Sequence, residues 1–372
     1  MKKIVIIGGG LAGLVSAIIL SRKGLHVHVI EKKVYPFHRV CGEYISNETI
    51  PFLKSLDLFP EEFSPPHIRN FLLSATSGKY EKLPLDLGGF GLSRYILDEF
   101  LFKKAQASGA GFWLHTEAEN IIFHERENKF DISTSRGNIA ADVVIGSFGK
   151  RSRLDVQLNR SFIQKRSPYV GIKYHIKTDH PADLIALHNF PGGYCGMSNV
   201  EDGKTNLCYL THRDNVKKYK NIRDMEEAVL FTNPLLKSVF TNADFLFDKP
   251  EVINEISFET KSPVQNNILM AGDAAGMITP LCGNGMAMAI HASKIVSELV
   301  ERYCTDEHFS REELEKTYTY QWRKNFATRL WAGRQIQNLF GNEWASNVAI
   351  NLAIHVKPLA RIIMRNTHGK VF

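Results

Sequence analysis

The first 31 residues constrain the fold of this chain more than any other stretch. An apolar run over 4–7 leads into Gly8-Gly9-Gly10-Leu11-Ala12-Gly13, and the later stretch His26-Val27-His28-Val29-Ile30 is followed by Glu31. This order predicts a buried strand, a tight turn, a helix that begins on the turn, and a second buried strand. A chain that starts in this way is expected to bind a dinucleotide at the glycine turn.

Four residues of this segment have separate tasks in such a site. Gly8 lets the chain turn, Gly10 lets a pyrophosphate approach the backbone, and Gly13 lets the helix pack closely against the strand. The helix N-terminus offers unpaired N–H groups to the phosphates. Glu31 follows the turn by about 20 residues and is placed to accept a hydrogen bond from a ribose hydroxyl. Because its carboxylate would repel a 2′-phosphate, the site suits FAD or NAD better than NADP.

Composition sets broad limits on the class of protein. With 372 residues, 44% of them hydrophobic and 23% charged, the chain is expected to be globular, with two domains or one composite domain. The net charge of +7 fits an anionic substrate or membrane surface, and equally a mildly basic enzyme without such a partner; no nucleic-acid partner is expected. Five cysteines without a CxxC pair indicate neither a disulfide framework nor a metal site. The N-terminus imitates a signal peptide, but its glycines fit the dinucleotide turn, so we expect a cytoplasmic protein.

The rest of the chain interrupts the cofactor-binding half. Alternating residues over 169–256 predict antiparallel strands, with a hairpin turn at 201–204. The run 268–271 is again a fully buried strand. Other expected elements are a short helix at 47–56, two strands over 72–83, a helix at 92–101, short strands over 111–149 ending in a buried strand at 143–146, a helix at 286–303 and helical periodicity over 311–340 and on to 364. The pattern predicts a discontinuous cofactor domain with a sheet domain inserted into it.

A second motif, at 271–286, belongs to the same site. Gly272-Asp273 at the end of a strand can place a carboxylate on a ribityl or ribose hydroxyl. A Pro/Gly-rich turn over 280–285 then opens a helix, whose N–H groups can face the electron-rich edge of an isoalloxazine ring. Gly-Asp alone would be interpreted as a turn, but together with the first motif it indicates FAD.

Together these features resemble one FAD-dependent superfamily, which includes p-hydroxybenzoate-hydroxylase-like monooxygenases, flavin-dependent halogenases and geranylgeranyl reductases. The first motif with Glu31, Arg94 ahead of Asp98, and the second motif carry the resemblance, which covers roughly residues 1–300. It implies an α/β fold (an α+β composite) in which a Rossmann-like FAD-binding domain carries an inserted antiparallel β-sheet substrate domain and C-terminal helices. The implied boundaries are 1–70 plus 92–150 plus 262–305 for the FAD-binding domain, 71–91 plus 151–261 for the substrate domain, and 306–372 for the C-terminal helical segment.

The resemblance also implies particular contacts with FAD. Ala12 and Glu31 would contact the ADP part, and Arg94 a phosphate or the ribityl group. Asp273 would hold the ribityl chain, while Ala118 would contact the adenine through its backbone. The complete set of implied FAD-binding residues, with the last two at the flavin ring, is Gly8, Gly10, Ala12, Gly13, Glu31, Gly42, Arg94, Ala118, Gly272, Asp273, Gly283, Gly285 and Met286.

Two residues are candidates for catalysis, and each has an ordinary structural alternative. Cys41-Gly42 resembles the Cys-Gly that geranylgeranyl reductases carry after the second strand, near the flavin; a free cysteine is otherwise a small buried hydrophobe. Tyr194 lies in a segment that resembles the Gly-Tyr strand roofing the substrate, where it would be an aromatic wall or a proton donor. It is equally a sheet-packing tyrosine. Cys282, in the other flavin turn, is a further candidate to face the active site.

The sequence departs from the superfamily at 145–152, where hydroxylases have an Asp-Gly pair that helps to bind FAD and NADPH. Phe148 replaces the aspartate, which argues against NADPH use in the monooxygenase manner, while Lys150 and Arg151 can compensate electrostatically. None of the four tryptophans lies in the Trp-x-Trp-x-Ile-Pro pattern of halogenases. The electron donor is left open between NAD(P)H and a reduced carrier.

The segment 345–372 contains four basic residues and no acid among many apolar ones. Such a segment can lie peripherally on the inner face of an anionic membrane, or hold an anionic lipid or carrier-bound substrate. It is otherwise a closing helix packed on its own domain, broken or kinked at Pro358.

The favoured function is that of an FAD-dependent oxidoreductase that reduces carbon–carbon double bonds in a hydrophobic, isoprenoid or polyketide-like substrate. Reduced flavin would deliver a hydride, and Tyr194, Cys41 or water would supply the proton. A monooxygenase of the same fold and a non-catalytic, membrane-associated FAD-binding protein are the alternatives.

Overall fold

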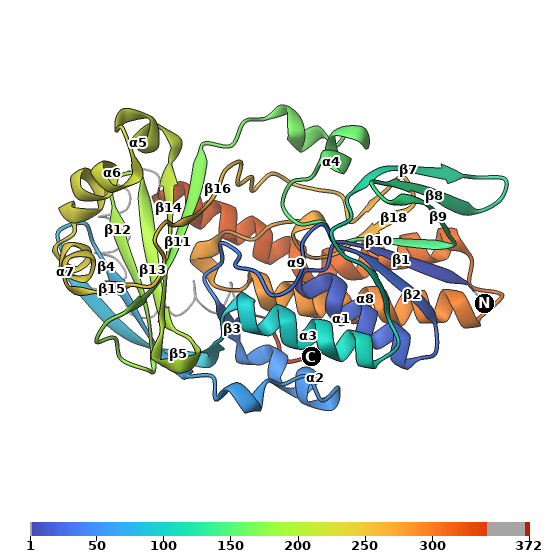
Figure 1. Ribbon diagram of the computed structural model, residues 1–372, viewed down its shortest axis with the longest axis horizontal. Helices are drawn as coiled ribbons and strands as arrows, with labels where there is room; N and C mark the ends of the chain where they lie inside the picture. Colours follow the sequence, from blue (N-terminus) through green and yellow to red (C-terminus); the bar gives the residue numbers. More distant parts are fainter. Residues whose placement is uncertain (1, 341–368) are drawn as a thin grey trace.

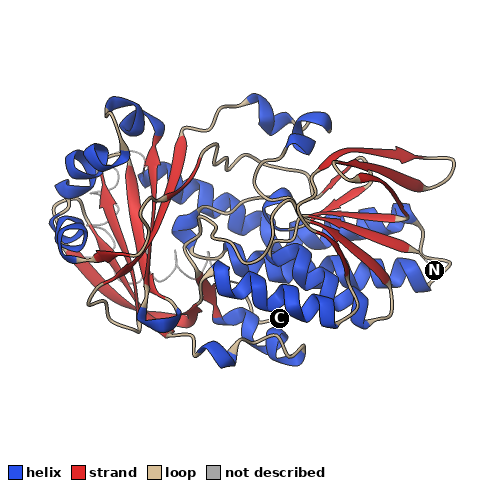
Figure 2. Ribbon diagram, viewed as in Figure 1, coloured by secondary structure: helices blue, strands red, loops and turns tan. Residues whose placement is uncertain are grey.

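Two large β-sheets lie toward opposite ends of the molecule, with long helices packed along the first sheet and reaching toward the second (Figure 1). The computed structural model describes residues 2–340 and 369–372. Loops pass several times between the two sheets, so residues far apart in the sequence meet between them (Figure 2). The expected α/β architecture is confirmed.

The first sheet has six strands in the order β17-β18-β10-β1-β2-β6. All are parallel except β17 at one edge. Its central strands are buried on both faces, as expected for a parallel sheet covered by helices and loops. The predicted buried strands are thus confirmed. The bounds are β1 Lys3–Ile7, β2 His26–Ile30, β6 Gly111–Trp113, β10 Val143–Gly146, β17 Val264–Gln265 and β18 Ile268–Met270.

Helix α1 (Leu11–Arg22) begins directly after the glycine turn, and its residues 11–21 are all buried. It is enclosed because it packs on α3 (Arg94–Ala107) on one side and on α8 (Gly285–Thr305) on another. Helix α9 (Arg311–Phe340) packs in turn on α8. No helix within 2–340 or 369–372 is long and apolar enough to cross a bilayer.

The second sheet has nine strands in the order β15-β11-β14-β13-β12-β4-β5-β3, with β16 paired to β11. The hairpin between β13 and β14 turns at 201–204 as predicted, and β4 and β5 are the two strands expected over 72–83, each longer than expected. The bounds are β3 Tyr44–Ser46, β4 His67–Ser74, β5 Tyr80–Gly91, β11 Tyr169–Lys177, β12 Leu184–Phe190, β13 Gly193–Asn199, β14 Thr205–His212, β15 Asp244–Phe245 and β16 Glu251–Ile253.

The expectation of antiparallel strands throughout 169–256 is wrong for 213–242, which forms α5 (Arg213–Lys218), α6 (Ile222–Val229) and α7 (Pro234–Asn242). Each of these helices starts at a residue whose side chain accepts a backbone N–H, namely His212, Asn221 and Asn233. These caps and the helical spacing of the buried residues Met225 and Val229 explain why this segment forms helices and not strands. The helices cover the outer face of the second sheet.

The remaining described elements are small. A three-stranded sheet consists of β7 Ala118–His124, β8 Lys129–Thr134 and β9 Gly137–Ala141, and two short helices are α2 Ile50–Ser55 and α4 Arg153–Gln157. The predicted continuation of helix toward 364 and most of the basic segment 345–372 lie outside the described residues. Strand β3 and the start of β4 belong to the second sheet, although they fall within 1–70. The predicted domain boundaries stay a prediction.

Candidate active site

The glycine turn is packed as tightly as its predicted tasks require. Gly8 has a φ of +102°, and a Cβ there would lie 2.4 Å from the Ser147 carbonyl oxygen. A Cβ on Gly13 would lie 2.0 Å from the Gly8 carbonyl oxygen, so only glycine lets α1 approach β1 this closely. Above Gly10 there is room, because the nearest atom to a Cβ would be Arg94 Nη2 at 3.8 Å. A pyrophosphate can approach the backbone there.

Glu31 follows β2 directly and is almost completely buried. Its carboxylate accepts a hydrogen bond from the Gly9 N–H (2.8 Å), and Arg39 Nη2 lies 3.6 Å away. The Thr116 N–H donates to the Glu31 carbonyl oxygen (3.0 Å), which brings Ala118, two residues later, to the same end of the first sheet. The residues implied for the ADP part of the cofactor therefore lie together.

Arg94 meets a second arginine that sequence analysis did not single out. The Arg94 guanidinium makes two hydrogen bonds to the buried Asp98 carboxylate (2.6 and 2.7 Å), and Arg39 Nε donates to the same carboxylate (2.9 Å). Two guanidinium groups and two carboxylates, those of Asp98 and Glu31, therefore lie beside the open space over Gly10. Guanidinium groups can donate charge-assisted hydrogen bonds to an anionic pyrophosphate. Arg39 lies in the loop between β2 and β3, which has no regular pattern. Its position shortly after Glu31 was the only feature of the sequence that could have pointed to a role at the cofactor site.

The second motif reaches the same place. A Cβ on Gly272, whose φ is +62°, would lie 3.1 Å from Ala12 Cβ, so the turn after β18 packs against the first turn of α1. Burial raises the pKa of the Asp273 carboxyl, and nearby cations, Lys261 and Arg94 among them, oppose this. Lys261 Nζ also donates to the Asp273 carbonyl oxygen (2.8 Å). Asp273 therefore lies within the electrostatic reach of Arg94.

The turn before α8 also returns to this region. Gly283 has a φ of +62°, and a Cβ there would lie 3.3 Å from the ring of Tyr44 on β3. Gly285 and Met286 are the first two residues of α8. One small cavity is lined by both Asp273 and Gly285. The ribityl-binding and flavin-ring residues implied by the resemblance are thus neighbours in space.

The segment that departs from the superfamily is held by other contacts. Ser147 Oγ donates to the Gly8 carbonyl oxygen (2.6 Å) and so secures the glycine turn. Lys150 Nζ donates to the Asn254 carbonyl oxygen, and Arg151 pairs with Glu255 (3.3 Å). Burial lowers the pKa of Lys150 to about 8. Both cations therefore bind residues 254 and 255. The sequence had suggested a different role for them, namely electrostatic compensation near the cofactor for the missing aspartate.

Cys41 and Gly42 lie in the loop between β2 and β3, against the second sheet. Asn206 Nδ2 donates to the Cys41 carbonyl oxygen (3.1 Å), and Ser198 Oγ donates to that of Gly42 (3.4 Å). Burial raises the pKa of the Cys41 thiol, so the thiol keeps its proton at neutral pH. A Cβ on Gly42 would meet nothing within 4 Å, so the backbone there is open to a neighbour.

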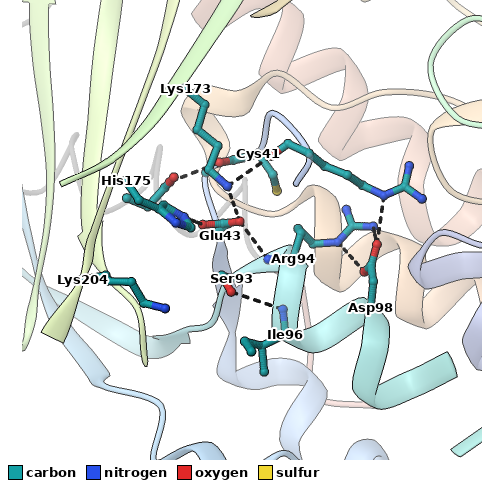
Figure 3. A network of polar contacts seen from close by, with 12 residues as sticks. Cys41, Glu43, Ser93, Arg94, Ile96, Asp98, Lys173, His175 and Lys204 are labelled. Carbon is teal, nitrogen blue, oxygen red and sulfur yellow. Dashed lines mark hydrogen bonds and ion pairs between the residues drawn. The ribbon is translucent and has the colours of Figure 1, made fainter. Parts of the chain in front are cut away.

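Directly after Gly42 the structure places a buried ionic cluster that sequence analysis missed (Figure 3). The Glu43 carboxylate accepts hydrogen bonds from Lys173 Nζ (2.5 Å), His175 Nε2 (2.6 Å) and the Arg94 N–H (2.8 Å). The side chains of Glu43 and Lys173 are fully buried. In the sequence, Lys173 and His175 occupy alternate positions of a strand, and charged residues at this spacing usually indicate an exposed face.

Tyr194 and Cys282 lie together at the other end of the same face of the second sheet. Tyr194 belongs to a buried apolar cluster that joins this sheet to Leu281 and Met277 of the second motif. Burial raises the pKa of Tyr194 well above its usual value, and the nearby Cys282 thiol adds to this. Tyr194 is therefore packed in the sheet and also faces the flavin turn, so the two interpretations of this residue are compatible.

The residues present fit FAD, because open backbone at Gly10, two guanidinium groups and a carboxylate at a strand end meet at one edge of a parallel sheet. Fold and site define a dinucleotide-binding flavoprotein. The family described as FAD binding domain matches residues 1–332, and the chain belongs to this family. It is an FAD-dependent oxidoreductase with FAD as its cofactor.

Three known proteins are similar to this chain in sequence or in fold. A digeranylgeranylglycerophospholipid reductase of Methanosarcina acetivorans is 25% identical over 356 residues, which are 91% of this chain and 84% of that protein. A geranylgeranyl bacteriochlorophyll reductase-like protein of Thermoplasma acidophilum has a TM-score of 0.75 at 17% identity, over 94% of this chain and 91% of that one. A flavin-dependent brominase has a TM-score of 0.79 at 17% identity, over 100% of this chain and 94% of that one. The two structures show a shared fold.

Proposed function

We propose that this flavoprotein reduces carbon–carbon double bonds in a hydrophobic isoprenoid substrate, of which a glycerophospholipid with geranylgeranyl chains is the best candidate. The names of several relatives support the reaction and the substrate class. The missing tryptophan motif argues against the halogenation chemistry of the structural neighbours. The apolar cluster around Tyr194 is the observation in the structure that carries the proposal.

This cluster lies between the second sheet and the flavin turn. Its buried members are aliphatic or aromatic, namely Leu73, Ala75, Leu187, Tyr194, Leu210 and Ile256, and Met277 and Leu281 of the flavin turn pack against them. An apolar surface beside a flavin fits an isoprenoid chain, because such a chain gains free energy by leaving water. It offers little to hold a polar aromatic substrate.

Reduced FAD supplies a hydride when it is bound, and the double bond needs one proton in addition. The chain carries two buried protonated groups at the second sheet. Burial keeps the proton on the Tyr194 phenol and on the Cys41 thiol at neutral pH. We assign these two residues as the candidates for delivering it, with water as the third source.

A geranylgeranylated glycerophospholipid in detergent is the substrate for the test. The protein is reduced chemically under nitrogen and mixed with the lipid, and the lipid mass is measured. We expect two added hydrogens for each reduced double bond. Addition of an oxygen atom only when air is admitted would instead identify a monooxygenase, which the shared fold also allows.

We further propose that the basic segment 345–372 brings the protein to an anionic membrane surface, where such a lipid resides. Four cations without an acid over 28 residues favour anionic headgroups. This proposal rests on the sequence of that segment and on the substrate class.

A further inference from the structure

The loop 39–43 is attached to the second sheet at four of its five residues by hydrogen bonds. Each of these hydrogen bonds is donated by a side chain of β11, β13 or β14. The donors and acceptors are Lys173 Nζ to the Arg39 carbonyl (3.2 Å), Asn206 to the Cys41 carbonyl (3.1 Å), Ser198 to the Gly42 carbonyl (3.4 Å), and Lys173 and His175 to the Glu43 carboxylate (2.5 and 2.6 Å).

These donors come from one face of the sheet. His175, Asn206 and Ser198 are directly opposite one another on the three neighbouring strands. Lys173 is two residues from His175, so its side chain projects to the same face. The register also places Tyr194 on this face, opposite Leu210 and Gly171. The face therefore has an apolar end around Tyr194 and a polar end whose side chains donate hydrogen bonds to the loop 39–43.

Glu43 is the centre of the polar end. Its φ of +53° is uncommon for a residue with a side chain, and it turns the carboxylate into the protein. Burial by itself would raise the pKa of Glu43, but Lys173 and His175 reverse this and lower the pKa to about 2. The carboxylate is thus ionised at neutral pH, and Lys173 balances its charge at a fully buried position.

Glu43 also reaches the phosphate end of the cofactor site. It accepts the Arg94 N–H at the start of α3 (2.8 Å), and the Arg94 guanidinium lies over the glycine turn. A displacement of Glu43 would move the Cys41 loop and the start of α3 together. The buried Glu43 carboxylate therefore connects the loop 39–43, the start of α3 and the second sheet (Figure 3). In the proposed function the second sheet is the substrate-facing sheet.

We propose that Glu43 and Lys173 are positioning residues of the flavin site, which fix Cys41 and Arg94 relative to the substrate-facing sheet. The inference rests on the proposed function only for turnover. Its direct readout is the bound flavin, so failure of the substrate assignment leaves the inference open to test.

The test replaces Lys173 by methionine, which keeps the length of the side chain and removes its charge. Lys177→Met is the matched control, because Lys177 lies on the same face of β11 but is exposed. For each protein, the dissociation constant of FAD and the absorption spectrum of the bound flavin are measured.

We expect Lys173→Met to weaken FAD binding by about tenfold or more, as displaced binding groups do, and to shift the flavin spectrum. Removal of the lysine leaves the buried Glu43 carboxylate without the cation that pairs with it, so the loop of Cys41 and the start of α3 should shift. Lys177→Met should bind FAD with the wild-type affinity and spectrum.

A Lys173→Met protein with wild-type affinity and spectrum would overturn the proposal. If this variant does not fold, the double variant Glu43→Gln/Lys173→Met removes both buried charges and is measured in its place. We expect it to fold and to have an altered flavin spectrum. A double variant with the wild-type spectrum and affinity would equally contradict a positioning role.

Discussion

At the scale of single residues, Glu226 on α6 is a buried carboxyl that holds its proton unusually tightly. It accepts hydrogen bonds from the hydroxyls of Tyr174 (3.0 Å) and Tyr209 (2.6 Å), which lie between α6 and the outer face of the second sheet. Burial raises the pKa of Glu226 from 4.5 to about 7, although both hydrogen bonds oppose this. The folded chain therefore binds this proton more strongly than the unfolded chain does.

Because the pKa is raised on folding, the stabilisation from Glu226 is complete below about pH 4.5 and is lost as the pH rises through 7. A tenfold change in an ionisation constant corresponds to about 1.4 kcal/mol, so about 2–3 kcal/mol should disappear between pH 5 and pH 8. We expect Glu226→Gln to remove this dependence, as measured by urea unfolding across that range. Its exposed neighbour Glu227 provides the control, and a Glu227→Gln protein should behave as wild type. An unchanged slope in Glu226→Gln would show that other groups cause the dependence.

Gly8 allows a second prediction at this scale. A Cβ at Gly8 meets the Ser147 carbonyl at 2.4 Å, whereas a Cβ at Gly109, whose φ of +92° is similarly positive, meets nothing within 4 Å. Gly109→Ala should cost about 1 kcal/mol of stability through backbone strain and leave FAD binding intact. Gly8→Ala should cost more and abolish FAD binding, measured by flavin fluorescence. Equal behaviour of the two variants would show that the close approach at the glycine turn is unimportant.

At the scale of elements, one buried carboxylate also connects helix α9 to the segment before α2. Glu48 is fully buried, and Arg329 of α9 pairs with it at 3.2 Å. The Gly369 N–H donates to the same carboxylate, and Phe372 stacks on His291 of α8 at 4.0 Å. The end of the chain and α9 are thus fastened to the cofactor half of the molecule.

Removal of Arg329 should loosen this attachment. Arg329→Met leaves Glu48 buried without its cation, and we expect a loss of about 3 kcal/mol, since breaking a buried ion pair from one side costs about 3–5 kcal/mol. Arg323→Met, at an exposed position of the same helix, should change stability by less than about 0.5 kcal/mol. Thermal unfolding of both variants decides the matter, and equal melting temperatures would contradict the assigned role of Glu48.

At the scale of the whole molecule, the sequence predicted the parts of the fold that follow local rules. The glycine turn, the buried strands and the long helices each have a pattern of their own, and they lie where predicted. Contacts between distant segments have no such pattern. Arg39, Glu43 and Lys173 acquire their roles only because loops from the first sheet cross to the second.

The domain boundaries and the helices over 213–242 show the same limit. Strand β3 lies between two segments of the cofactor half but pairs with β5 of the second sheet, and no local signal marks that pairing. In 213–242 the capping residues were visible in the sequence, but the strand pattern before them was extended too far.

The proposed membrane contact is tested on the whole chain. A triple variant in which Lys357, Arg361 and Arg365 become glutamine should bind anionic phospholipid vesicles about tenfold or more weakly, since each cation near the surface contributes about 1 kcal/mol. Arg323→Gln/Lys324→Gln, on the exposed face of α9, is the matched control for charge. Co-sedimentation with vesicles measures the binding of both variants. Equal binding by the triple variant and the wild type would show that the segment 345–372 does not bind the membrane.

Reoxidation of the reduced flavin by substrate, in the absence of oxygen, is the most direct measurement of the central claim. The protein is reduced under nitrogen and mixed in a stopped-flow instrument with a geranylgeranylated glycerophospholipid, and the flavin absorbance is followed. We predict that the oxidised flavin spectrum returns at a rate that depends on lipid concentration, and that a fully saturated lipid has no effect. A flavin that stays reduced with the unsaturated lipid and reoxidises only when oxygen is admitted would contradict the assignment as a double-bond reductase.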